Sequence, residues 1–357
     1  MIAVETSPRM RHQLGVRFAV CALVLVACQR HEPPPTTDDH APKKPRVAPI
    51  DPDDDTCDPS KPKICLGDDV VACEPDGHLG RRLRACHKGC QDGRCSNTCE
   101  DDSTKLIYLV DTSNDFMSFD PRLLPGNPIK VVGKLKCGHW GSPFSMSVDR
   151  NGIAWVVYDN GEMFKVNITD AKCEPSGYVA GSSGSTTFGM GFVTDTSGGD
   201  AEKLYIAANN SSNALHAIDT SHDLVPRRHG TITGTDDRNP ELTGTSEGKL
   251  YGFYPSMFST AFVQEIDKTN GAAVGKKWPL GTDPLGDVTA YAFAQWGGVF
   301  YIFTTVDDGM DSNSSVRTVD RTTGKYRTIM THLPYRISGA GVSTCAPERD
   351  SSNPKGP

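Results

Sequence analysis

The chain has 357 residues, of which 37% are hydrophobic and 23% charged, so it can bury a core as one large domain or two smaller ones. Its 35 glycines and 25 prolines favour turns, and no stretch keeps the i, i+3, i+4, i+7 apolar spacing of amphipathic helices, which excludes a helical protein. The formal net charge of −7 argues against a nucleic-acid partner, because such binding depends on Lys and Arg that neutralise phosphates.

Residues 1–27 have the features of a secretory signal peptide. Three arginines precede a short apolar run, Phe18 to Ala27, which cannot span a bilayer core of about 30 Å as a helix. The run ends in Leu-Val-Ala-Cys, which is typical of a bacterial lipobox, where a peptidase cuts before a cysteine that carries lipid. We therefore expect Cys28 to be lipidated and to attach the chain to a membrane. An ordinary secretory signal is the alternative.

Residues 28–56 contain the sequences PPPTT, KKP and DPDDD and few apolar side chains. Such a composition cannot bury enough surface to fold, so this segment is expected to be a disordered linker.

A small cysteine-rich module is expected at residues 57–99. About 40 residues bury too little apolar surface to fold without cross-links, and twelve cysteines in the chain indicate an oxidising compartment. A zinc site that uses Cys86, His87 and Cys90 is the competing interpretation, but no paired C-x2-C spacing supports it. We expect three disulfides among six cysteines, Cys57, Cys65, Cys73, Cys86, Cys90 and Cys95.

Residues 100–346 carry a repeat. An aromatic residue inside an apolar strand recurs at spacings of 47, 50, 46 and 50 residues, and each copy is accompanied by three further short strands. Four strands in a period of 40 to 50 residues predict the blades of a β-propeller. The five aromatic residues are Tyr108, Trp155, Tyr205, Tyr251 and Tyr301.

The first repeat begins at its second strand, whereas the last strand of the chain, residues 338–345, has no partners of its own. The C-terminal strand is therefore predicted to complete the first blade, which gives an all-β propeller of five four-stranded blades. Residues 347–357 are expected to be a disordered tail.

This closure predicts a disulfide. When the last strand is aligned with residues 144–152, Cys345 falls at the first turn of its blade, across from Cys99. A Cys99–Cys345 bond would close the ring covalently. Cys137 and Cys173 are the remaining candidates for a pair, although a regular blade would place them near opposite faces.

Two motifs resemble functional sites. Residues 244–248, GTSEG, match the G-x-S-x-G nucleophile elbow, but they occupy the position of a hairpin turn and no helix follows. Residues 307–313 are acidic and could suggest calcium, yet the expected bidentate Glu is missing, and a solvated loop explains them better. Neither motif supports a catalytic or metal site, and no cofactor is expected.

A ligand face is the remaining candidate site. His139 and Trp140 lie in the segment that enters the second blade, and Phe144 follows them. The first strands of the blades are rich in Ser, Met, Gly and Phe, which does not favour a metal in the channel. A binding or scaffold module is therefore the preferred function, and the alternative is a propeller hydrolase or lyase with a metal or acid/base site in the central channel.

The lipobox, the linker, the cysteine-rich module and blades such as SPFSMSVDRNGIAWVVY and GAGVSTCAP resemble cysteine-rich propeller lipoproteins of the myxobacterial type. The resemblance covers nearly the whole mature chain, but no activity is established for that group. It implies a lipid anchor in the cell envelope, and Gln29 after the lipidated cysteine implies the outer membrane. The expected partners are the membrane, through the lipid on Cys28, and an envelope protein or glycan.

Overall fold

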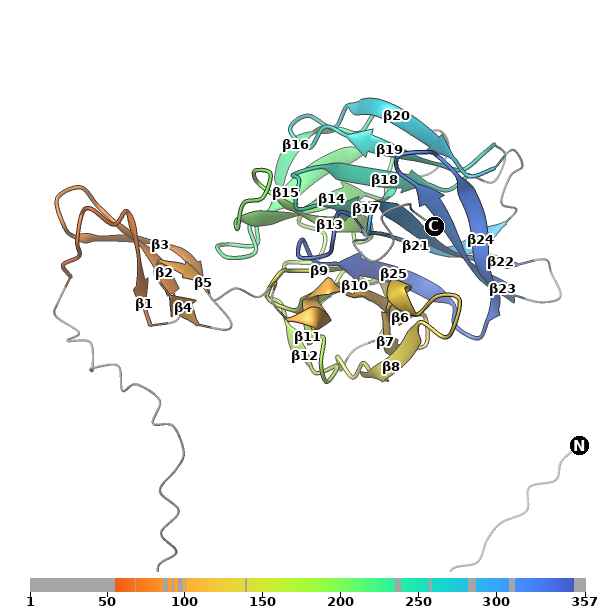
Figure 1. Cartoon of the computed structure of the whole chain (residues 1–357), viewed down its shortest axis with the longest axis horizontal. Helices are drawn as coiled ribbons and strands as arrows, with labels where there is room; N and C mark the ends of the chain where they lie inside the picture. Colours follow the sequence, from red (N-terminus) through yellow and green to blue (C-terminus); the bar gives the residue numbers. More distant parts are fainter. Residues whose placement is uncertain are drawn as a thin grey trace, which may run out of the picture. The chain divides into compact units, whose positions relative to one another are not determined.

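The computed structural model describes residues 55–349, apart from 68, 86–88, 92, 96–98, 100, 139, 235–238, 257–258, 282–286 and 308–311. The predicted signal peptide, Cys28 and most of the predicted linker lie outside the described residues, so lipidation stays a prediction. The described chain forms a small cysteine-rich module and a five-bladed β-propeller (Figure 1).

The cysteine-rich module consists of a three-stranded sheet and a two-stranded ribbon. It begins slightly earlier than predicted, because Thr56 pairs with His78. Disulfides join Cys57 to Cys73 and Cys65 to Cys90, so the zinc alternative, which needs Cys90, is wrong. Cys86 lies outside the described residues, and the third predicted bond stays a prediction. The strands are β1 (Lys63–Leu66), β2 (Asp69–Cys73), β3 (Leu79–Ala85), β4 (Cys90–Gln91) and β5 (Arg94–Cys95).

Each propeller blade is an antiparallel sheet of four strands. Blade 1 contains β25 (Ile337–Val342), β6 (Ile107–Asp111), β7 (Asp115–Phe119) and β8 (Ile129–Lys134). Blade 2 contains β9 (Pro143–Val148), β10 (Ile153–Tyr158), β11 (Met163–Asn167) and β12 (Cys173–Pro175). Blade 3 contains β13 (Phe188–Thr194), β14 (Glu202–Ala208), β15 (Ala214–Ile218) and β16 (Arg227–Thr231).

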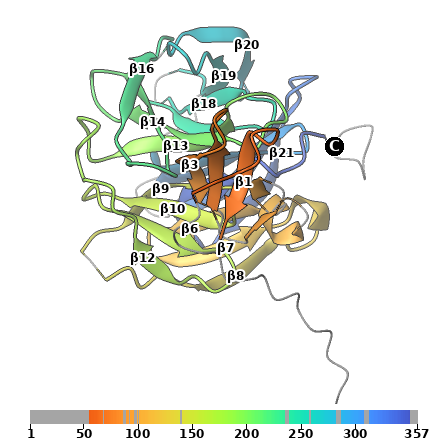
Figure 2. The ribbon, with the colours of Figure 1, turned by 90° about the vertical axis from the view of Figure 1, so that its left-hand side faces the viewer.

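Blade 4 contains β17 (Glu241–Gly244), β18 (Leu250–Tyr254), β19 (Phe262–Ile266) and β20 (Ala273–Pro279). Blade 5 contains β21 (Val288–Trp296), β22 (Val299–Asp307), β23 (Ser312–Asp320) and β24 (Tyr326–Leu333). Two short 3-10 helices, η2 (Asp102–Lys105) and η3 (Pro121–Leu123), belong to blade 1 connections. The first strands β9, β13, β17, β21 and β25 surround the axis, while outer strands such as β8, β12, β16 and β20 lie at the rim in both views (Figures 1 and 2).

The predicted repeat is confirmed by the strand register. Each of the five recurrent aromatic residues lies on the second strand of its blade, at most 6% exposed, and pairs with a small residue of the inner strand. The inner-strand partners are Gly341, Ser147, Gly191, Thr243 and Ala294. Because side chains alternate between the two faces of a strand, each blade contributes apolar residues to both neighbours. Five buried clusters result, one at each blade interface.

The ring is closed by β25, which pairs with β6 through Gly341 and Tyr108, as predicted for the C-terminal strand. The strand covers Ile337–Val342, slightly earlier than predicted. Cys99 and Cys345 form a disulfide just beyond it, so the predicted ring-closing bond is confirmed.

The Cys137–Cys173 disulfide is also present, and the expectation that these residues lie near opposite faces is wrong. Strands twist relative to their neighbours by roughly 20–25°, so the outer strand of one blade leans toward the last turn of the next blade. Gly133 shows this approach, because a Cβ at that position would lie 3.0 Å from the Cβ of Ala171. Blades 3 and 4 repeat it, with Thr233 N donating to the carbonyl of Gly271 at 3.1 Å.

Candidate functional site

One end of the propeller axis carries the turns that join the first and second strands of the blades; we call it the hairpin face. Residues 343–348, which we call the C-terminal segment, lie across it and contact all five blades. Ser343 Oγ donates to the carbonyl of Thr104 in blade 1, and Cys345 is bonded to Cys99, whose sulfur accepts from Arg150 of blade 2. Thr344 Oγ1 donates to Glu202 of blade 3. Glu348 accepts from Ser246 N of blade 4, and the carbonyl of Pro347 accepts from Gly297 N of blade 5.

These contacts correct one predicted boundary. Pro347 and Glu348 were expected in a disordered tail, but Glu348 accepts hydrogen bonds from Ser246 N at 2.8 Å and from Arg321 Nη1 at 3.1 Å. The ordered propeller therefore continues at least to Glu348. Pro347 and Glu348 are ordered because Cys345 holds them next to the hairpin turns. There their oxygen atoms accept hydrogen bonds from backbone N–H groups that no neighbouring strand pairs with.

Glu202 links the C-terminal segment to blades 2 and 3. Its carboxylate accepts from Arg150 N at 2.8 Å and from Thr344 Oγ1 at 2.6 Å. Glu202 is half-buried. Desolvation, and then the neighbouring carboxylate of Asp149, raise the pKa of Glu202 to about 7.

A second buried carboxyl group lies beside the axis. Glu241, on the inner strand β17, is 2% exposed and accepts hydrogen bonds from Met190 N at 3.2 Å and from the hydroxyl of Ser145. Ser145 is on β9, beyond the intervening inner strand β13, so this side chain ties three blades together. Burial raises the pKa of Glu241 to about 8, and the carboxyl group is therefore mostly protonated at neutral pH.

The inner strands around Glu241 pack backbone against backbone. A Cβ on Gly189 of β13 would lie 2.3 Å from the carbonyl oxygen of Pro240, so only glycine allows this approach. Sequence reasoning described the inner strands as Ser-, Met-, Gly- and Phe-rich and missed Glu241. An alignment of the inner strands could have revealed Glu241. In each inner strand one residue pairs with the recurrent aromatic residue, and the position two residues earlier holds Ser145 in blade 2, Gly189 in blade 3 and Glu241 in blade 4.

The opposite end of the axis carries the segments that connect one blade to the next; we call it the connection face. Of the predicted ligand-face residues, Trp140 lies here with 93% of its surface exposed. His139 is outside the described residues. Phe144 is half-buried and packs against the core cluster between blades 2 and 3. The structure therefore does not gather the three residues on one surface, and a ligand-binding role for Trp140 stays a prediction.

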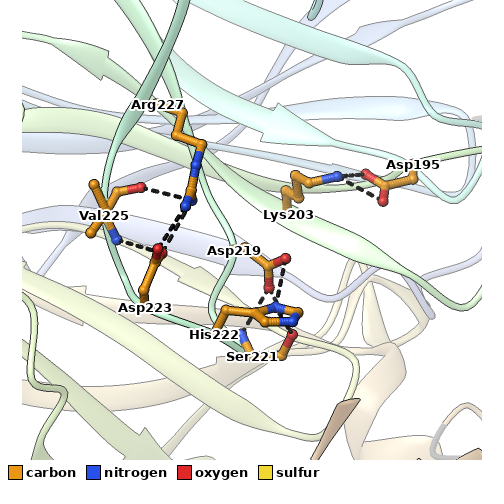
Figure 3. Close-up of polar contacts among 8 residues, drawn as sticks. All are labelled: Asp195, Lys203, Asp219, Ser221, His222, Asp223, Val225 and Arg227. Atoms are coloured by element: carbon orange, nitrogen blue, oxygen red, sulfur yellow. Dashed lines mark hydrogen bonds and ion pairs between the residues drawn. The ribbon is translucent and has the colours of Figure 1, made fainter. Parts of the chain in front are cut away.

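Blade 3 brings together a serine, a histidine and an aspartate in the turn that follows β15 (Figure 3). Nδ1 of His222 lies 2.9 Å from Asp219 and 3.1 Å from the hydroxyl of Ser221. Both contacts use the same ring nitrogen, and Ser221 Oγ donates to Asp219 at 2.7 Å. A catalytic triad needs the two ring nitrogens for the two partners, so this arrangement is a turn network.

Other contacts in Figure 3 have the same local character. Lys203 pairs with Asp195, and Arg227 with Asp223, each between residues close in the sequence. The hydrogen bonds from Arg227 and from Val225 N lower the pKa of Asp223 to about 2. These pairs stabilise turns.

The two predicted motifs are parts of blades. GTSEG forms the hairpin between β17 and β18, as predicted, and Ser246 donates to Glu348. In the acidic stretch 307–313, Asp307 pairs with Ser312 at the end of the β22–β23 ladder, and residues 308–311 lie outside the described residues. Within the described ranges no group of three or more His, Cys, Asp or Glu side chains is placed to hold a metal ion. No helix of the described chain is long and apolar enough to cross a membrane.

No protein-family model and no curated protein matches the sequence. Among solved structures, the chain is similar to an α-L-arabinofuranosidase from Clostridium thermocellum, with 13% identity and a TM-score of 0.39 over 56% of this chain and 76% of that one. It is similar to a putative TolB from Agrobacterium tumefaciens, with 10% identity and a TM-score of 0.39 over 67% and 82% of the two chains. A gluconolactonase from Xanthomonas campestris has 12% identity and a TM-score of 0.34 over 68% and 79%. Likenesses this distant carry no inference about activity.

Proposed function

We propose that this chain is a lipid-anchored bacterial envelope protein whose propeller serves as a binding or scaffold module. The observation that carries the binding role is Trp140 at the connection face, whose indole is exposed to solvent and whose backbone carbonyl accepts a hydrogen bond from Asn160. Exposed aromatic side chains on such segments supply large contact areas for partners at a low entropic cost. The lipobox before Cys28 supports the anchor, and four disulfides in the described chain support an oxidising compartment.

Co-sedimentation with isolated envelope fractions tests this function. The mature chain with Cys28→Ser, which cannot be lipidated, should sediment with outer-membrane or cell-wall material and be competed by unlabelled protein. The wild-type chain expressed with its signal should carry lipid at Cys28 by mass spectrometry. Absence of lipid on Cys28 would refute the anchor, and absence of saturable sedimentation would refute the binding role.

The protonated carboxyl group of Glu241 favours the second candidate, a hydrolase or lyase with an acid/base residue on the axis. Its hydrogen bonds to blades 2 and 3 account for it as a structural residue, so we place this function second. Release of new reducing or unsaturated ends from envelope glycans, lost in Glu241→Gln with the fold retained, would establish the enzymatic function.

A further inference from the structure

The segment around Trp140 is held at several points although its side chain is exposed. The disulfide to Cys173 fixes Cys137 on one side. On the other side, Ser142 and Asp159 exchange two hydrogen bonds, from Ser142 N to the carboxylate at 3.2 Å and from Asp159 N to the carbonyl at 3.0 Å. Asn160 Nδ2 donates to the carbonyl of Trp140 itself at 2.8 Å. These contacts hold Cys137, the carbonyl of Trp140 and Ser142, which lowers the entropic cost that a ligand would bear for ordering the backbone at Trp140.

The other tryptophans of the chain are used differently. Trp155, Trp278 and Trp296 are 2–5% exposed, and each indole N–H donates to a protein acceptor at 2.7–3.2 Å. Three of four tryptophans therefore serve the core, as expected for a large residue with one polar group. Trp140, at 93% exposed, contributes nothing comparable to the stability of the fold.

The surface beside Trp140 is polar. The exposed turn at Asp159 and Asn160 lies next to Trp140, and within it Glu162 accepts a hydrogen bond from Asn160 Nδ2 at 2.8 Å. Its other side abuts the next connecting segment, where a Cβ on Gly161 would lie 3.1 Å from the Cβ of Thr186. We call the surface formed by Trp140 and the turn at residues 159–162 the connection strip.

This chemistry matches a sugar chain. A pyranose ring has an apolar C–H face that can stack on an indole and hydroxyl groups at its edge that pair with carboxylates and amides. Asp159 and Glu162 make the strip acidic, which disfavours phosphate- or sulfate-bearing ligands. An anionic lipid surface would instead require Lys and Arg beside the aromatic anchor, and the described residues of the strip, Trp140 and 159–162, include neither.

We infer that the connection strip binds an uncharged polysaccharide, with Trp140 stacking on a sugar ring and the Asp159–Asn160 turn contacting its hydroxyl groups. This inference rests on the proposed binding function and specifies its ligand class.

The test uses the mature Cys28→Ser chain and tryptophan fluorescence. Because Trp140 is the exposed member of the four, acrylamide quenches mainly its emission. The probes are the neutral polysaccharides dextran, glycogen, galactomannan and hydroxyethylcellulose, the acidic polysaccharide alginate, and vesicles of phosphatidylcholine with phosphatidylglycerol. At least one neutral polysaccharide should reduce quenching and retard the protein in an affinity gel, whereas alginate should do neither.

Variants assign the effect to the strip. Trp140→Ala should weaken binding about 5- to 150-fold, the range that loss of one aromatic stacking partner causes for nucleobases. Trp140→Phe should retain part of the binding. Val131→Ala, at another exposed apolar residue on the rim strand β8, is the matched control and should bind as the wild type does. An unchanged thermal unfolding midpoint shows that each variant is folded.

Several results would overturn the inference. These are no binding to any neutral polysaccharide, binding that Trp140→Ala leaves unchanged, or binding confined to the vesicles or to alginate. Sedimentation with envelope fractions that persists in Trp140→Ala would leave the proposed function standing while removing this ligand assignment. Loss of all sedimentation by the wild-type chain would instead remove the proposed function.

Discussion

At the hairpin face, residues 343–348 contact every blade, and their side chains form a disulfide and hydrogen bonds to neighbouring turns. At the connection face, Cys137 is held by a disulfide and the backbone of Trp140 and Ser142 by hydrogen bonds, while the side chain of Trp140 is exposed. The two ends thus use similar means of fixation for different purposes. Residues at the hairpin face hold the ring closed, and residues at the connection face are positioned and left accessible.

This difference explains why strained or buried polar groups need not mark the functional surface. Glu202 and Glu241 have the raised pKa values that often indicate a functional site, yet both are engaged in hydrogen bonds between blades. Trp140 has no such signature and is distinguished by exposure alone. For this propeller, stability and binding are therefore expected to respond to different substitutions.

The largest effect is expected from removing the ring-closing disulfide. Cys99→Ser with Cys345→Ser should lower the free energy of unfolding by about 2–5 kcal/mol, because the bond spans 246 residues and strongly restricts the unfolded chain. Urea unfolding measures the change. The exposure of Trp140 to acrylamide should stay unchanged, since the connection face does not depend on this bond.

The matched control is Cys137→Ser with Cys173→Ser, which opens a bond across only 36 residues. It should cost less stability and should increase the mobility of the segment that carries Trp140. If the two double variants destabilise the fold equally, or if the first one alters the quenching of Trp140, the two faces are not independent.

The repeat, the number of blades and the ring-closing bond could all be predicted because they depend on local periodicity. Strand alternation recurs within each 46–50 residue unit, and aligning the last strand with residues 144–152 places Cys345 opposite Cys99. Features that depend on how blades tilt against each other could not be predicted this way. The Cys137–Cys173 bond belongs to this group.

The candidate site residues also divide into those that local periodicity predicts and those that depend on contacts between blades. The exposure of Trp140 agrees with its place in a connecting segment. Phe144 instead lies on strand β9, where side chains alternate between the two faces, and it packs toward a blade interface. The contacts of Glu241 and Glu348 join strands and turns from different blades. No spacing within one repeat indicates which blades an inner-strand carboxylate or a residue beyond the last strand will reach.

An intermediate effect is expected for Glu241, and it should depend on pH. The folded state holds its proton up to about pH 8, whereas the unfolded chain loses it near the ordinary value of 4.5. Between these values the unfolded state binds fewer protons, so stability should fall as pH rises, by at most about 1.4 kcal/mol per pH unit. Glu241→Gln mimics the protonated form and should flatten this decline.

Unfolding midpoints in urea at pH 5, 6, 7 and 8 provide the measurement. The variant and wild-type chains should have similar stability at pH 5, and the variant should be the more stable at pH 8. Glu202 contributes a decline of the same sign up to about pH 7, so part of the slope should remain in Glu241→Gln. Glu247→Gln controls for the change in net charge. A variant slope equal to that of the wild type would show that Glu241 is ionised in the folded protein.

The smallest effect concerns the far end of the C-terminal segment and compares two glutamates near the same arginine. Glu348 is largely buried and accepts from Ser246 N, Ser246 Oγ and Arg321. Glu247 lies 3.9 Å from Arg321 and its side chain is 41% exposed. Glu348→Ala should cost about 2–3 kcal/mol, because buried partners lose charge-assisted hydrogen bonds, whereas Glu247→Ala should cost less than about 1 kcal/mol. Equal losses in urea unfolding would mean that Arg321 is stabilised from the exposed side, and that the C-terminal segment ends functionally at Cys345.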